Sequence, residues 1–229
     1  MDSDISEKRV VSKMRVADHG EVYTGKREVN AMLDLVKQET ERIESRFLVP
    51  ACGTGNFVTE ILERKLGIVE TRYRKSQLDY ERSAVLAVSS VYGIDILGDN
   101  VVECRKRLFQ IFDQKYTSLF KKKATEECRN AVQFILEKNI IWGDALTLKT
   151  VGDNPQPIVF SEWSPVNGSM LKRRDFAFHE LLPKDKQRDL PLFSTLNQPL
   201  YSDLGDEVFI PLPVKEYPLT HFMRVPDAE

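Results

Sequence analysis

The sequence predicts an α/β fold in which a parallel sheet carries helices on both faces. Apolar runs typical of strands alternate with segments of helical periodicity, which is the pattern of β-α-β units. Glycine-containing or acidic turns follow three of these runs, after Val49, Ile94 and Trp142. A chain of 229 residues, 41% hydrophobic and 30% charged, is long and apolar enough to build such a domain around a core.

The expected elements follow from periodicity and turn residues. Strands are expected at residues 46–49, 89–96, 139–146 and 157–161, each a short apolar run bounded by turns. Helices are expected at residues 28–43, 58–66, 99–112 and 123–136, where apolar residues recur at helical spacing. Residues 67–88 are interpreted as an inserted or extended helical segment, and residues 170–182 are compatible with a helix. The last part of the chain is rich in proline, with one short strand expected at 208–210.

Charge and cysteine content exclude several classes of protein. A net charge of −2 provides no overall positive field, which argues against a stand-alone DNA-binding protein held by phosphate contacts. Three widely spaced cysteines form neither a disulfide framework nor a zinc pattern, so no metal is expected. The first ten residues lack an apolar signal-peptide core, and no apolar run is long enough for a membrane span. We therefore expect a cytoplasmic protein without membrane contacts.

The turns after the first three strands indicate a nucleoside site. In a parallel α/β sheet, ligands bind at the carboxyl ends of the strands. Gly53 and Gly55 would allow the backbone to approach a ligand closely, and Asp95 could accept hydrogen bonds from both ribose hydroxyls. Asp144 could accept one from an exocyclic adenine amine. Each feature alone also fits a purely structural turn. Residues 57–58 replace the third glycine of dinucleotide-binding loops, which makes an oxidoreductase the least favoured alternative.

These residues also resemble a known family. Residues 50–57 (PACGTGNF) resemble the cofactor loop of S-adenosylmethionine-dependent DNA adenine-N6 methyltransferases, especially modification subunits of restriction-modification systems. Residues 20–24 resemble the segment that precedes this loop, and residues 92–95 and 143–146 resemble the ribose and adenine motifs, in the γ-type order over residues 18–168. The resemblance implies S-adenosyl-L-methionine as cofactor. It implies as cofactor-binding residues Tyr23, Thr24, Pro50, Ala51, Cys52, Gly53, Gly55, Asn56, Phe57, Asp95, Ile96, Asp144 and Ala145.

The same resemblance implies a Rossmann-like class I methyltransferase sheet with a short helical N-terminal segment and a loop-rich C-terminal tail. Residues 1–45 would form the N-terminal helical segment that packs on the cofactor site. Residues 46–182 would form the α/β methyltransferase-like domain, and residues 183–229 the C-terminal extension. Two positions depart from the family pattern, because Val49 stands in place of an acidic residue and Gly25 in place of a proline.

The expected catalytic motif is degenerate. The family carries D/N/S-P-P-Y/F/W after the fourth strand, where acceptor oxygens hold the adenine amine and the aromatic ring stacks on the flipped base. Here only Ser164-Pro165 keeps half of the motif, while Glu162 could accept from the amine and Trp163 could stack from a shifted position. The catalytic candidates are therefore Ser161, Glu162, Trp163, Ser164 and Pro165.

Three functions remain open from the sequence. The first is an active DNA adenine-N6 methyltransferase in a restriction-modification or mobile-element context. The second is a catalytically degenerate cofactor-binding subunit that needs a partner, and the third is a methyltransferase acting on RNA, protein or a small molecule. Expected partners are DNA, met by the basic runs 121–123 and 172–174, and a specificity or catalytic subunit.

Overall fold

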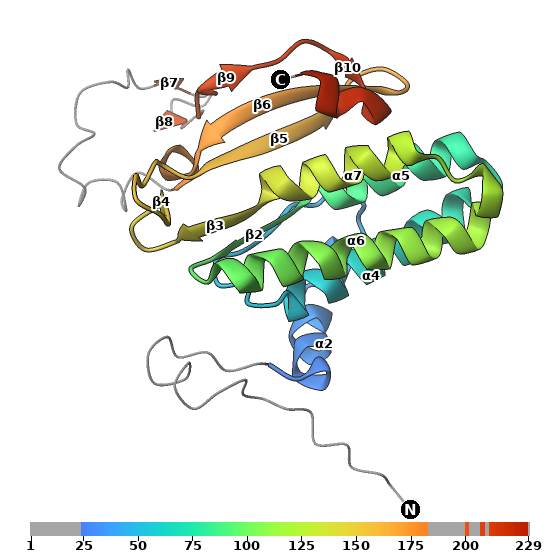
Figure 1. The fold of residues 1–229 in the computed structure, drawn as a ribbon, viewed down its shortest axis with the longest axis horizontal. Helices are drawn as coiled ribbons and strands as arrows, with labels where there is room; N and C mark the ends of the chain where they lie inside the picture. Colours follow the sequence, from blue (N-terminus) through green and yellow to red (C-terminus); the bar gives the residue numbers. More distant parts are fainter. Residues whose placement is uncertain (1–23, 183–199, 202–206, 209–210, 229) are drawn as a thin grey trace, which may run out of the picture.

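A three-stranded parallel sheet lies in the middle of the protein (Figure 1). The computed structural model describes residues 24–182, 200–201, 207–208 and 211–228. The strands β1 (Phe47–Val49), β2 (Val91–Asp95) and β3 (Ile140–Asp144) are hydrogen-bonded in that order, and a short β4 (Lys149–Thr150) runs antiparallel to β3. Every residue of β2 is buried, as expected for a central strand. The three predicted parallel strands are thus confirmed.

Two helical hairpins connect the parallel strands. Helices α4 (Asn56–Tyr73) and α5 (Gln77–Ser89) join β1 to β2, whereas α6 (Gly98–Phe120), the 3₁₀ turn η1 (Lys121–Lys123) and α7 (Glu126–Asn139) join β2 to β3. The first helix of each hairpin runs away from the carboxyl ends of the strands, and the second returns to the amino end of the next strand. The predicted helical segment 67–88 is therefore the end of α4 followed by α5.

Local sequence explains where the returning helices begin. Ser76 precedes α5 and its hydroxyl accepts a hydrogen bond from the Asp79 N–H, while Thr125 caps α7 by accepting from the Cys128 N–H. Between the hairpins, an aromatic cluster fills the core; it comprises Tyr80, Phe112, Tyr116 and Phe120. These contacts fix the two hairpins against each other.

The N-terminal helix is shorter than expected. The pattern over residues 28–43 predicts one helix, but the structure has α2 (Lys26–Asp34) and a single turn α3 (Lys37–Thr40). Val29 and Leu33 are the buried residues of α2, and they join the main core as the helix packs against α4. Only the first half of the predicted amphipathic helix therefore forms one continuous helix that packs on the core.

A second, antiparallel sheet lies above the parallel one in Figure 1. It contains β5 (Val159–Pro165), β6 (Met170–Ala177), β9 (Lys215–Glu216) and β10 (Thr220–His221), with β6 paired to the other three. Residues 170–182, which the sequence left compatible with a helix, form β6 and the turn η2 (Phe178–Leu181). The 3₁₀ segment η3 (Phe222–Ala228) packs on α7, and a separate pair joins β7 (Leu200–Tyr201) to β8 (Glu207–Val208).

The direction of β5 corrects the prediction of a fourth parallel strand. Ile158, the residue just before β5, lies beside the carboxyl end of β3. This is shown by Gly143 of β3, where an added Cβ would lie 2.7 Å from the Ile158 side chain. Trp163, near the end of β5, donates its indole N–H to Asn139 Oδ1 at 3.2 Å. Asn139 is the residue immediately before β3, so the end of β5 lies at the amino end of β3. Strand β5 therefore runs antiparallel to β3, and it pairs with β6 rather than with the parallel sheet.

The two faces of the parallel sheet are covered by different structures. Helices α4 and α6 pack on one face, as Figure 1 shows. On the other face, Tyr92 and Ile94 form an apolar cluster with Ile158, Phe160 and Phe178. Within the described part of the chain, the second sheet thus occupies the place where helices were expected. The fold is mixed α/β, and none of its described helices is both long and apolar enough to cross a membrane.

Candidate functional site

The turn after β1, residues 50–55, brings backbone N–H groups to the end of β2. We call it the glycine loop. Gly53 and Gly55 have φ angles of +54° and +96°, a left-handed backbone that other residues adopt at a cost. The Cys52 N–H donates to the Ile94 carbonyl at 2.9 Å, and the Gly55 N–H donates to Cys52 O at the same distance. The loop is therefore tightly folded and tied to β2 before α4 begins.

The glycine at position 55 makes room for the core. A Cβ added to Gly55 would lie 2.7 Å from the Cys104 Sγ on α6. Similarly, a Cβ on Gly93 would lie 3.0 Å from the Cys52 Sγ. A side chain at position 55 would therefore collide with a core thiol, so packing as well as the left-handed φ requires glycine here.

The Cys52 side chain points into the same core. Only 6% of Cys52 is exposed, and Cys104 and Cys128 are also buried. The hydrogen bond with the Cys104 thiol, together with burial, raises the pKa of Cys52 above its ordinary value. A neutral, buried thiol is an apolar packing group. The predicted cofactor residue Cys52 therefore offers its backbone, rather than its thiol, to the site.

Asp95 connects the glycine loop to the start of α6. Its Oδ2 accepts a hydrogen bond from the Gly53 N–H at 2.7 Å. Its Oδ1 accepts from the Leu97 N–H at 3.0 Å and from Asn100 Nδ2 at 3.2 Å. A carboxylate offers about four lone-pair positions, so these three donors leave one. One further donor can therefore be accepted, rather than the two ribose hydroxyls expected from the sequence.

Asp144 lies further along the same edge of the sheet. Because Asp95 is in register with Trp142, Asp144 extends about 7 Å beyond it along the strand direction. Its carboxylate accepts from the Leu146 N–H at 2.8 Å and from Thr147 Oγ1 at 3.0 Å. The Leu146 N–H lowers the pKa of Asp144 below its usual value, so this group is ionised at neutral pH.

Trp142 joins the two acidic turns, a role that sequence reasoning missed. Its indole N–H donates to the Ile96 carbonyl at 2.9 Å, and a Cβ added to Gly98 would meet the indole ring at 3.3 Å. Trp142 as a whole is 45% exposed. The only signal in the sequence is an aromatic residue two positions before Asp144, and within an apolar run it predicts no more than a strand position.

Arg107 braces the glycine loop from α6. Its Nη1 donates to Thr54 O at 2.7 Å and to Asn56 Oδ1 at 2.9 Å. The Asn56 amide in turn donates to Thr24 O at 3.0 Å. The segment just before α2 is thereby held at the glycine loop through Thr24.

The other predicted cofactor residues are distributed around this edge. Pro50, Ala51 and Ile96 are exposed, and Phe57 and Ala145 are half-buried. Tyr23 lies outside the described residues. The structure therefore brings together Gly53, Asp95 and, further along the edge, Asp144.

The catalytic candidates lie elsewhere. Because β5 runs toward the amino ends of the parallel strands, Ser164 and Pro165 lie at the edge opposite the glycine loop. The Ser161 hydroxyl donates to Asp175 Oδ1 at 2.7 Å and is buried. The Trp163 ring is only 4% exposed and belongs to the core. The structure therefore does not bring residues 161–165 to the glycine loop and Asp95, where they were expected.

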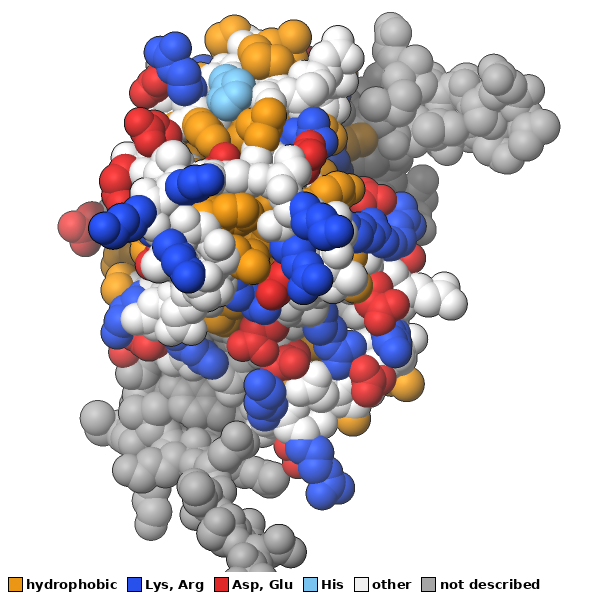
Figure 2. Space-filling model, turned by 90° about the vertical axis from the view of Figure 1, so that its right-hand side faces the viewer, with side chains coloured by type: hydrophobic (Ala, Val, Ile, Leu, Met, Phe, Trp, Pro, Cys, Tyr) orange, Lys and Arg blue, Asp and Glu red, His pale blue; other side chains and the backbone are white. Residues whose placement is uncertain are grey.

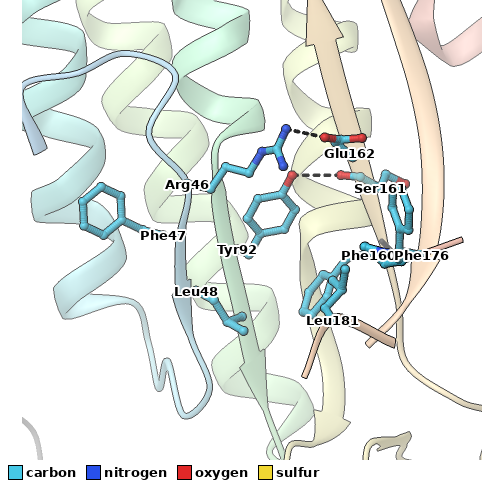
Figure 3. Close-up of a pocket in the computed structure, with 10 residues that line it drawn as sticks. Arg46, Phe47, Leu48, Tyr92, Phe160, Ser161, Glu162, Phe176 and Leu181 are labelled. Carbon is cyan, nitrogen blue, oxygen red and sulfur yellow. Dashed lines mark hydrogen bonds and ion pairs between the residues drawn. The ribbon is translucent and has the colours of Figure 1, made fainter. Parts of the chain in front are cut away.

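Glu162 lines a pocket between β1, β2 and the second sheet (Figure 3). The pocket has a volume of about 240 Å³. Arg46 and Arg174 form ion pairs with Glu162, and the Tyr92 hydroxyl donates to Ser161 O at 3.0 Å. Burial raises the pKa of Tyr92 above its ordinary value. The remaining lining residues are mainly apolar: Phe47, Leu48, Phe160, Phe176, Leu181 and Pro211.

The basic run 172–174 is neutralised within the fold. Arg173 is 6% exposed and forms a two-pronged pair with Asp175, with both N···O distances at 2.9 Å. Lys172 pairs with Glu216, and Arg174 pairs with Glu162. The expected DNA contact through this run is therefore not supported, whereas the run 121–123 is exposed.

Comparison with known proteins found no match to a protein family, to a curated protein or to a solved structure. Over the residues that the structure places, no group of three or more His, Cys, Asp or Glu side chains is arranged to hold a metal ion. The site must therefore be interpreted from its own geometry.

Proposed function

We propose that the carboxyl edge of the parallel sheet binds S-adenosylmethionine and that the chain is a methyltransferase-type cofactor-binding protein. The observation that carries this proposal is the 2.7 Å hydrogen bond from the Gly53 N–H to Asp95 Oδ2. It brings the predicted cofactor loop and the predicted ribose acceptor to one point, although they are 42 positions apart in the chain. Carboxyl edges of parallel sheets are common sites for nucleoside ligands.

The polar groups at this edge fit a nucleoside. The remaining acceptor position of Asp95 would bind one ribose hydroxyl, and the ionised Asp144 would accept from the adenine amine. Thr24 and Asn56 would border the loop on its other side. When bound, the cofactor supplies a methyl group that its sulfonium makes electrophilic. The resemblance favours DNA adenine as the methyl acceptor; RNA, protein and small molecules are the alternatives.

Calorimetry with S-adenosylmethionine and S-adenosylhomocysteine tests this proposal. We expect Asp95→Ala and Asp144→Ala each to lower affinity at least about tenfold, which corresponds to about 1.4 kcal/mol. Asp144→Ala is the more direct test of ligand contact, because Asp95 also accepts hydrogen bonds from the Gly53 and Leu97 N–H groups and its loss could alter the loop itself. Asp153→Ala is the matched control, since Asp153 is exposed and lies in the turn after β4. Absence of binding by the wild-type chain would refute the proposal, as would unchanged affinity in both site variants.

The direction of β5 favours a second candidate, a cofactor-binding subunit that does not complete the reaction alone. The side chains of Ser161, Glu162 and Trp163 are engaged in the fold, and Ser164-Pro165 lies at the opposite edge. Methyl transfer to adenine requires an acceptor beside the amine, which a partner chain would then supply. We expect cofactor binding without transfer of labelled methyl groups to single- or double-stranded DNA by the purified chain. Transfer at a rate typical of an enzyme would exclude this candidate.

A further inference from the structure

The tips of the two helical hairpins form a basic surface. The hydrogen bond from Gln77 Nε2 to Lys123 O, at 2.8 Å, holds the α4–α5 turn beside η1. The ring centroids of Tyr80 and Phe120 lie 5.2 Å apart just behind it. This contact brings together two basic segments that are far apart in the sequence. We call them the tip patch: Arg72, Arg74, Lys75, Lys121, Lys122 and Lys123.

The cations of the tip patch are exposed and lack acidic partners. All six residues are exposed, and none forms an ion pair with any residue that the structure places. Three carboxylates near these helix ends pair with cations outside the patch, whereas Glu127, at the start of α7, is exposed. Glu70 pairs with Lys115 at 3.2 Å, Asp79 with Arg82 at 3.0 Å, and Glu126 with Arg129 at 2.7 Å.

Figure 2 faces this end of the molecule. It shows Lys and Arg side chains on both sides of a small apolar area. Axes of packed helices lie about 8–10 Å apart, so the two basic segments are close enough to contact one extended ligand. Because the whole chain has a net charge of −2, this positive charge is local rather than part of a general field.

We propose that the tip patch binds the phosphate backbone of double-stranded DNA. Six exposed cations on an open surface do not form a pocket for a small anion. A duplex, by contrast, presents a negative charge about every 1.7 Å along its axis and can pair with all six. An acidic protein would need carboxylates at matched positions, whereas a duplex offers phosphates along its whole length.

The position of the tip patch separates it from the candidate cofactor site. Helix α4 begins at the glycine loop and ends at the patch; its 18 residues span about 27 Å. DNA held at the patch would therefore be anchored away from the strand ends. The inference does not rest on the proposed function, and it can be tested without cofactor.

Fluorescence anisotropy of a labelled duplex, with the full chain titrated at salt concentrations from about 50 to 200 mM, tests the proposal. One variant replaces Lys121, Lys122 and Lys123 by Gln, and a second replaces Arg72, Arg74 and Lys75 by Gln. Each should weaken binding at least about tenfold. Each should also reduce the slope of log K against log salt by about 2–3, since each lost phosphate contact contributes about 0.9.

A control with the same change in net charge replaces Lys37, Lys106 and Lys149, three exposed cations outside the patch. It should bind duplex within about twofold of the wild type. The proposal is overturned if the control loses as much affinity as the patch variants, or if both patch variants bind normally. It is also overturned if wild-type protein binds polyglutamate as tightly as the duplex. Cofactor affinity measured on the same variants should be unchanged, which separates this test from that of the proposed function.

Discussion

Lys65 is a fully buried cation that fastens the turn before β1 to α4. Its Nζ donates hydrogen bonds to three carbonyl oxygens, those of Arg42, Ile43 and Ser45. Its ammonium also lies 5.2 Å from the centre of the Phe47 ring. Buried lysines are rare because the charge loses hydration, and the three carbonyls compensate for part of that loss.

The pKa of Lys65 predicts a dependence of stability on pH. Burial lowers this pKa from 10.5 to about 7. Between these values the unfolded chain binds the proton and the folded chain releases it, so stability should increase as pH rises from about 7 to 10. The slope of the free energy of unfolding against pH should approach about 1.4 kcal/mol per pH unit. Urea denaturation of the wild type and of Lys65→Met at several pH values measures this slope. The free energy of unfolding of the wild type should rise with pH relative to that of Lys65→Met. A difference between the two proteins that does not change with pH would contradict the lowered pKa of Lys65.

Gly55→Ala should destabilise the protein for two separable reasons. The left-handed backbone at φ +96° costs an alanine about 1–2 kcal/mol, and the Cys104 Sγ lies only 2.7 Å from the new methyl group. We expect the free energy of unfolding, measured by urea denaturation, to fall by about 2–4 kcal/mol. Combining the substitution with Cys104→Ala should remove the steric part and retain the backbone part. Equal losses in both backgrounds would show that no steric clash exists.

At the residue scale, the sequence predicted the meeting of the glycine loop with Asp95 because adjacent parallel strands end at the same edge. It did not predict the neighbours that use up the acceptors of Asp95, such as Leu97 and Asn100. These contacts depend on the exact path of the chain after β2. The role of Trp142 was missed for the same reason, since its partner is a main-chain carbonyl that no sequence pattern marks.

At the scale of elements, β6 shows why charged strands are hard to recognise. Leu171, Arg173 and Asp175 alternate as buried positions, but two of the three are charged, so the period of two is not visible in hydrophobicity. The direction of β5 was equally hidden. An apolar run predicts a strand, yet periodicity carries no information about whether that strand is parallel or antiparallel to its neighbours.

Arg173 links the strands of the second sheet to each other. Its guanidinium lies 4.0 Å from the centre of the Tyr217 ring and 5.4 Å from that of Trp163, and it pairs with Asp175. The Tyr217 hydroxyl also donates to Asp175 at 3.1 Å. These contacts connect β6 to Trp163 on β5 and to the segment after β9.

Arg173→Met should therefore lower the free energy of unfolding by about 3–5 kcal/mol, because it leaves the buried Asp175 carboxylate without its cation. Adding Asp175→Asn should recover part of the loss, since no unpaired charge would remain. Urea denaturation, followed by Trp fluorescence, measures both effects. Arg224→Met is the control, because Arg224 is an exposed partner of Asp227 and should change stability by less than about 0.5 kcal/mol. A loss in Arg173→Met no larger than this would show that the buried pair is dispensable.

At the scale of the whole molecule, the long crossover connections separate two ends with different chemistry. One end carries the glycine loop and the acidic turns of the parallel strands, and the other carries the tip patch. The sequence predicted the parallel strands and the extra helical length between Gly55 and Asp95. It could not predict that both crossovers are hairpins whose tips meet, because the meeting depends on the contact between Gln77 and η1.

This separation predicts that cofactor and DNA stabilise the chain independently. A ligand present at about 100 times its Kd should add about 2.7 kcal/mol to the free energy of unfolding. S-adenosylhomocysteine should give this increase in the wild type and in the Lys121–Lys123 variant, but no more than about 1.4 kcal/mol in Asp144→Ala under the same conditions. A short duplex should stabilise the wild type and Asp144→Ala fully, and the tip-patch variant by no more than about 1.4 kcal/mol. Because the sites lie about 27 Å apart along α4, the two increments should add within about 0.5 kcal/mol. A larger deviation would mean that the helices transmit binding from one end to the other, and that the protein couples DNA contact to cofactor binding.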